Sequence, residues 1–129
     1  MARQYENQLS GTVNVVTTTE TVALVTPPVS TTFGSDAIEI EGMVNLTAGT
    51  GTTAAVLRIR RGNGITGTVV RAADTDTIAA GSSESFLVQG VDTPGDVAGQ
   101  VYSITVQQTA ASANGTINGA SSCVAVGQP

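Results

Sequence analysis

Apolar and polar residues alternate with a period of two through most of this 129-residue chain. The alternation is clearest in DAIEIEGMVNLT (residues 36–47), where apolar residues or glycine occupy almost all of the even positions. Neighbouring side chains of a β-strand point to opposite faces of a sheet, so this pattern predicts strands with one buried face. Gly, Pro, Asn and Asp interrupt it roughly every eight to fifteen residues, and we find no convincing helix. The sequence therefore predicts an all-β chain folded as an antiparallel β-sandwich.

We expect eight strands in this fold. Their ranges are 11–17, 20–26, 36–47, 54–61, 67–72, 84–91, 100–108 and 120–126. Pro27 and Pro28 separate the first two strands from the others, because proline cannot donate a backbone hydrogen bond within a central sheet. We therefore divide the chain into an extended N-terminal arm with its leading strands (residues 1–30) and a β-sandwich domain (residues 31–129). The alternative is that residues 1–30 simply form the first strands of the same sandwich.

The short loop AGTGTT (residues 48–53) joins two alternating segments and predicts a β-hairpin. If Thr47 pairs with Ala54, Glu41 lies opposite Arg60, and apolar positions meet on the other face. Opposed charges of this kind contribute about 0.2–1 kcal/mol each and help to select a register. Glu41 and Arg60 are thus our candidate outer-face pair. We interpret them as a structural feature, and the alternative is a face that binds a partner.

The composition excludes several classes of function. Charged residues make up 12% of the chain, whereas ordinary domains have roughly 25%, and the net charge is −5 with no lysine. This acidic balance argues against a nucleic-acid partner, and no apolar run approaches the roughly 20 residues of a membrane span. Aromatic residues are only 3%, so small and β-branched side chains must fill a thin core. Such a core favours further stabilisation by oligomerisation.

Catalytic chemistry also finds little support in the sequence. There is no histidine, and GNGITG (residues 62–67) is followed by a β-branched, acidic segment instead of the helix that a dinucleotide site requires. We interpret it as a turn. Asp74 and Asp76 lack the remaining ligands of a calcium loop, and Cys123 is expected to be a buried small hydrophobe. A glycosidase with paired carboxylates is formally possible, but the chain has no tryptophan to hold a sugar. We expect no enzyme, no cofactor and no metal site.

The C-terminal part carries a recognisable order of features. GVDTPGDVAGQVYSITV (residues 90–106) passes from a turn cluster into an alternating strand, and a polar loop and the closing strand ASSCVAV (residues 120–126) follow. Over residues 78–127 this order resembles jelly-roll or tumour-necrosis-factor-like β-sandwich domains of bacteriophage virion proteins. The resemblance implies trimers around a three-fold axis and places Tyr102 near the packing centre. The alternative for Tyr102 is a core aromatic whose hydroxyl reaches a loop carbonyl.

The sequence thus leads to a noncatalytic structural protein of a virion, made in the host cytoplasm. The resemblance points to a bacteriophage capsid decoration (cementing) or head-spike subunit. Its expected partners are further copies of itself and the major capsid protein. The alternative is a carbohydrate-binding or adhesin-like sandwich, including a receptor-binding fibre domain. That alternative needs a flat face of aromatic residues, which this composition scarcely provides.

Overall fold

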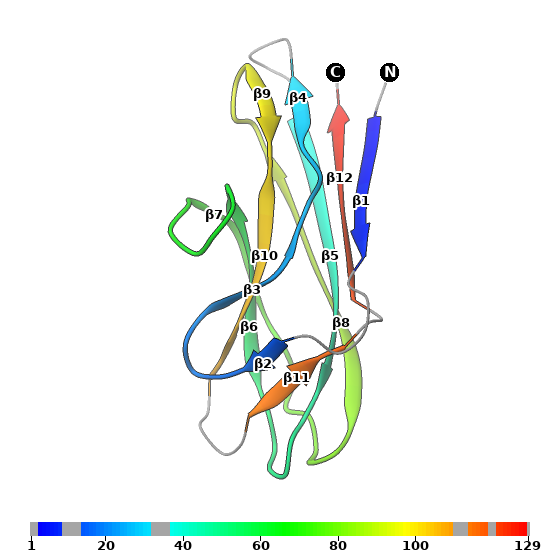
Figure 1. The fold of residues 1–129 in the computed structure, drawn as a ribbon, viewed down its shortest axis with the longest axis vertical. Coiled ribbons are helices and arrows are strands. Elements are labelled where there is room, and N and C mark those ends of the chain that lie inside the picture. The colour runs from blue at the N-terminus through cyan, green and yellow to red at the C-terminus, as the bar shows by residue number, and fades with distance from the viewer. Residues whose placement is uncertain (1–2, 9–13, 32–36, 110–113, 119–120, 129) are drawn as a thin grey trace.

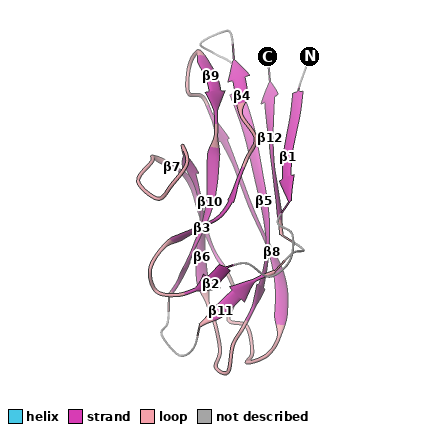
Figure 2. Ribbon diagram, viewed as in Figure 1, coloured by secondary structure: helices cyan, strands magenta, loops and turns pink. Residues whose placement is uncertain are grey.

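The computed structural model describes residues 3–8, 14–31, 37–109, 114–118 and 121–128. These residues form strands, turns and loops, and none of them belongs to a helix that could cross a membrane (Figure 2). The strands are β1 (Arg3–Gln8), β2 (Asn14–Val16), β3 (Thr21–Val25), β4 (Val29–Thr31), β5 (Ala37–Thr47), β6 (Ala55–Arg61), β7 (Val69–Asp74), β8 (Ser83–Asp92), β9 (Val97–Gln100), β10 (Tyr102–Gln108), β11 (Gly115–Ile117) and β12 (Ser122–Gln128).

Two antiparallel sheets form the body of the molecule (Figure 1). In the first, here called sheet A, the order is β1-β12-β5, with β8 on the other side of β5. β11 pairs with Leu46 and Thr47 at the end of β5, and β2 pairs with β11. In the second, sheet B, the order is β3-β10-β6-β7. The pairs β1–β12, β3–β10, β5–β8 and β6–β7 are nested in the sequence, as in one long hairpin wound into two layers. This nesting is the jelly-roll topology, so the predicted all-β sandwich is confirmed.

The core lies between the two sheets. On β5 the even positions Ile38, Ile40, Val44 and Leu46 are buried, as the alternation predicts. They meet alternate residues of the facing sheet: Leu57 and Ile59 on β6, and Tyr102, Ile104 and Val106 on β10. Burial of each large aliphatic side chain contributes about 1.5–3 kcal/mol. Cys123 is buried in the same core, as expected.

The described part of residues 1–30 belongs to the sandwich itself. β1 pairs with β12, β3 pairs with β10, and Leu24 and Val29 are buried in the core. Pro27 and Pro28 lie in the gap between β3 and β4, and this gap is opposite the break between β9 and β10. At the same point, Thr26 N donates to Tyr102 O (2.9 Å). The predicted boundary at residue 30 falls inside β4. These pairings are those expected of the alternative, in which residues 1–30 form the first strands of the sandwich, and the division of the chain at residue 30 stays a prediction.

The predicted hairpin of residues 36–47 and 54–61 does not form. β5 and β6 lie in different sheets, because the connection between them pairs with residues 78–82. Ala48 N donates to Ser82 O (2.9 Å), and Thr53 and Ile78 exchange backbone hydrogen bonds of 3.0 and 2.7 Å. The connection therefore carries the chain from one layer to the other instead of folding it back. Period-two alternation identified the buried face of each strand correctly, but it carries no information on which strand is the neighbour.

The segment GNGITG is a turn, as predicted. Gly62 and Gly64 have φ angles of 94° and 140°, in the region that favours glycine. The Ser103 hydroxyl fastens the turn to β10, because it donates to Gly62 O (2.7 Å) and accepts from Gly64 N (2.9 Å).

Candidate interaction surface

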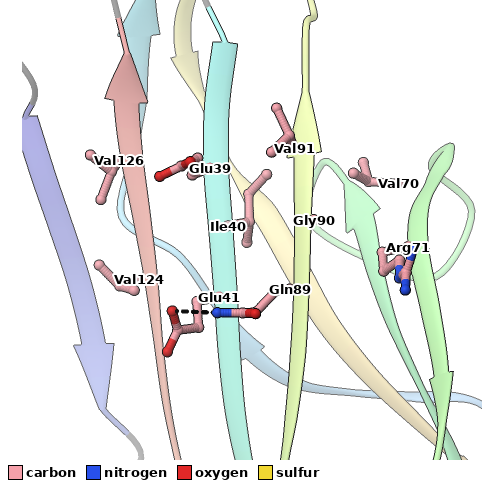
Figure 3. Close-up of a pocket in the computed structure, with 10 residues that line it drawn as sticks. All are labelled: Glu39, Ile40, Glu41, Val70, Arg71, Gln89, Gly90, Val91, Val124 and Val126. Carbon is pink, nitrogen blue, oxygen red and sulfur yellow. Dashed lines mark hydrogen bonds between the residues drawn. The ribbon is translucent and has the colours of Figure 1, made fainter.

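A groove of about 600 Å³ crosses the outer face of sheet A and reaches β7 (Figure 3). It is lined by Glu39, Ile40, Glu41, Val70, Arg71, Gln89, Gly90, Val91, Val124 and Val126. Most of these residues occupy the outward positions of β5, β8 and β12, and two come from β7.

Strand register brings the polar groups of the groove into one row. Glu41 is the Cα partner of both Gln89 on β8 and Val124 on β12. Gln89 Nε2 donates to Glu41 Oε2 (3.0 Å), which orients the carboxylate across the sheet. This is the position of the first residue of the predicted Glu41–Arg60 pair. Arg60 lies in sheet B, where its Cα partners are Ser103 and Val69, so the pair does not form.

Gly90 occupies an inward position of β8, like Val88 and Asp92, and its missing side chain lets β7, at the edge of sheet B, approach β8 closely. A Cβ atom at Gly90 would lie 3.0 Å from Arg71 Cβ and 3.3 Å from Val70 Cγ1. The missing side chain therefore lets Arg71 stand beside β8, at the level of Gln89 and Glu41 (Figure 3). Among the residues that the structure describes, no ion pair involves Arg71.

The middle strand of the groove carries exposed aliphatic side chains. Leu87 is 44% exposed and Val91 is 58% exposed, and both occupy outward positions of β8. Val124 and Val126, on the other side of β5, are half-buried. The surface therefore has carboxylates on β5, aliphatic groups on β8 and a guanidinium group on β7. Such a combination suits recognition of another surface better than it suits bond-breaking chemistry.

Tyr102 lies fully buried between the sheets, at the start of β10. Its hydroxyl donates to Asp92 Oδ2 (2.8 Å), where the sequence analysis considered a loop carbonyl. Arg61 donates to both oxygens of the same carboxylate, from Nε to Oδ2 (2.9 Å) and from Nη2 to Oδ1 (2.6 Å). Because Asp92 ends β8 and the other two residues lie in sheet B, these bonds tie the two sheets together.

The electrostatics of this cluster keep its protonation states fixed near neutral pH. Burial acts to raise the pKa of Asp92, but the hydrogen bonds from Arg61 and Tyr102 outweigh it and hold that pKa below its usual value. Burial, with the hydrogen bond to Asp92, raises the pKa of Tyr102 far above its usual range. A carboxylate that stays charged and a phenol that stays neutral form a structural link, not an acid–base pair working near pH 7.

A second ionic cluster, which the sequence analysis missed, is centred on Glu20. Its carboxylate accepts from Arg60 Nε (2.5 Å) and Nη2 (2.9 Å), from Thr105 Oγ1 (2.8 Å) and from Arg58 Nη1 (3.2 Å). The hydrogen bond from Arg60 is the main cause of the lowered pKa of Glu20, and burial opposes it. The sequence holds one signal for this cluster: Glu20 is the only acidic residue between residues 7 and 35.

No known protein family matches this chain, and no curated protein matches it either. Among solved structures, the fold is similar to a chain of the infectious bursal disease virus Gx strain, with 10% identity and a TM-score of 0.60. The similarity covers 99% of this chain and 33% of the viral one, so this chain spans about a third of that chain's length. A chain of the Bacillus endospore appendages, described as disulfide-linked pili, is similar over 98% of this chain and 87% of that chain. Its identity is 22% and its TM-score is 0.43. The likeness to the viral chain shows a shared fold.

Proposed function

We propose that this chain is a noncatalytic structural subunit of a virion, which acts by assembling with copies of itself and with a capsid protein. The observation that carries the proposal is the outer face of sheet A. This face presents the exposed aliphatic side chains of β8 between the carboxylates of β5 and the guanidinium group of β7, and such a mixture of apolar and charged groups suits a surface that a partner covers. In its finer form the proposal is a bacteriophage capsid decoration or head-spike protein that forms a trimer, as the resemblance to such proteins implies.

The use made of the ionisable groups supports a noncatalytic role. The Asp92 carboxylate is occupied by Arg61 and Tyr102, and the Glu20 carboxylate is occupied by Arg60, Arg58 and Thr105. Both clusters strengthen the sandwich. No group of three or more metal-ligating side chains gathers in the described part of the chain.

A carbohydrate-binding role receives no comparable support. Sugar-binding β faces use exposed aromatic rings, whose apolar faces pack against the sugar. The two aromatic residues whose side chains are described are Tyr102, which is buried, and Phe86, which is half-buried. Neither of them offers a ring to a ligand on the surface.

The mass of the purified chain in solution tests this proposal. We expect sedimentation velocity at micromolar concentrations to give a homo-oligomer, which is built of trimers in the finer form of the proposal. A monodisperse monomer across the range would contradict it. Binding of that monomer to immobilised polysaccharides would favour the carbohydrate-binding alternative.

A further inference from the structure

We propose that a second copy of this chain docks on the outer face of sheet A, face to face, about a two-fold axis that runs along β8. This inference rests on the proposed self-assembly and assigns a surface and a geometry to it. The occupant is another copy, instead of an unrelated protein, because the opposite charges of Glu41 and Arg71 in the groove change places under a two-fold rotation.

The positions of the charged groups supply the first argument. Glu41 lies on β5 and Arg71 on β7, on opposite sides of β8 (Figure 3). They lie at the same level along that strand, because Glu41 is the register partner of Gln89 and Arg71 stands beside Gly90. A two-fold rotation about β8 exchanges the two sides. Glu41 of each copy then meets Arg71 of the other copy, which makes two equivalent ion pairs.

The aliphatic groups supply the second argument. Leu87 and Val91 lie on β8 itself, so a rotation about this strand brings them against the same residues of the second copy. Apolar contacts at the axis with ion pairs on both sides form an interface with an apolar centre and a polar rim. The groove beside these residues leaves room for the side chains of the second copy.

A two-fold contact is compatible with a three-fold one on another surface. A subunit that uses only this face forms a dimer. A trimer whose subunits all use it joins a second trimer into a hexamer. The interface therefore predicts an even number of subunits in solution. Loss of the interface should halve the mass of the oligomer.

Charge reversal tests the pairing directly. With Arg71→Glu alone, two carboxylates face each other in both pairs, and with Glu41→Arg alone, two guanidinium groups do. Because like charges repel, each variant should self-associate about tenfold more weakly than the wild type. When the two variants are mixed in equal amounts, both cross-pairs join opposite charges. We expect the mixture, and equally the chain that carries both substitutions, to associate within about threefold of the wild type. Analytical ultracentrifugation over a concentration series, with one variant labelled, measures these constants.

A matched pair of apolar variants tests the axis. Leu87→Ser should weaken association, whereas Ile65→Ser, in the 62–67 loop of sheet B and 42% exposed, should not. If the wild type is an oligomer whose mass none of these substitutions changes, the two-fold contact is wrong and the proposed function stands. If the wild type is a monomer at every concentration, the two-fold contact and the proposed function are both wrong. If the mixture of the Arg71→Glu and Glu41→Arg variants associates as the wild type does, while each variant alone associates more weakly, the contact is established.

Discussion

At the residue scale, Tyr102 shows how one aromatic side chain can join two layers of a thin core. Its ring lies among aliphatic groups, and its hydroxyl reaches an aspartate that Arg61 already holds. Alternation along residues 100–108 predicts that Tyr102 points inward. It does not predict Asp92 as the partner, because the two residues become neighbours only through the turn and the short strand β9 between them.

We predict that Tyr102→Phe lowers the free energy of unfolding by about 1.5–3 kcal/mol, because a hydrogen bond to a buried charged group is lost. Urea unfolding of the wild type and the variant measures the change. Asp92→Asn should destabilise the protein as well. The double variant should lose less than the sum, because the two substitutions remove the same bond. Additive losses would mean that the Tyr102–Asp92 bond contributes nothing to stability.

At the element scale, sequence patterns located the strands better than they paired them. All eight predicted strands overlap observed ones, and 36–47 and 54–61 coincide with β5 and β6 almost residue for residue. The strands that were missed include the short strands β4, β9 and β11, whose three or four residues are too few to show alternation. Pairing failed for Glu41 and Arg60 because it depends on the crossing between layers after β5, and that crossing leaves no periodic signal.

The ion pair between Arg60 and Glu20 leads to a second prediction. Substituting Glu20 and Arg60 by glutamine, singly and together, should give a coupling energy of about 1–2 kcal/mol at pH 7. The same cycle for Glu41 and Arg60 should give a value near zero. The pKa of Glu20 is lowered in the folded protein, so its contribution is complete above the unfolded value of about 4.3. It is lost as the pH falls from there through the folded value.

Denaturant unfolding at pH 7 and at pH 3 measures both effects. The Glu20–Arg60 coupling should shrink at pH 3, where protonation of the carboxylate begins to remove the ion pair. A coupling that is unchanged between the two pH values would contradict the assignment. So would a coupling between Glu41 and Arg60 as large as that between Glu20 and Arg60.

At the scale of the whole molecule, the nested topology makes the first strands dependent on the last ones. β1 completes sheet A only through β12, and β3 completes sheet B only through β10. The N-terminal strands therefore pair with strands that lie about 80 to 120 positions later in the sequence. Local composition does not reveal a partner at the other end of the chain, so the Thr-rich start with its two prolines does not by itself distinguish an arm from the first strands of the sandwich.

The role of these strands leads to the last prediction, which concerns deletion of residues 2–29. The deletion removes β1, β2, β3 and the start of β4, and with them Val16, Leu24 and Val29 from the core. At about 1.5–3 kcal/mol for each buried aliphatic side chain, the loss is roughly 5–9 kcal/mol, against a total stability of about 5–15 kcal/mol for a typical domain. It also exposes a long free side of β10, so we expect no cooperative unfolding transition and a tendency to aggregate.

Deletion of residues 2–8 is the matched control, because it removes only the edge strand β1. This shorter deletion should leave a folded, less stable protein with β-type circular dichroism. If the chain that lacks residues 2–29 instead keeps that spectrum and a sharp thermal transition, the N-terminal strands are separable from the sandwich, as an assembly arm would be. The contrast between the two deletions thus decides whether the N-terminal segment builds the subunit or only extends from it.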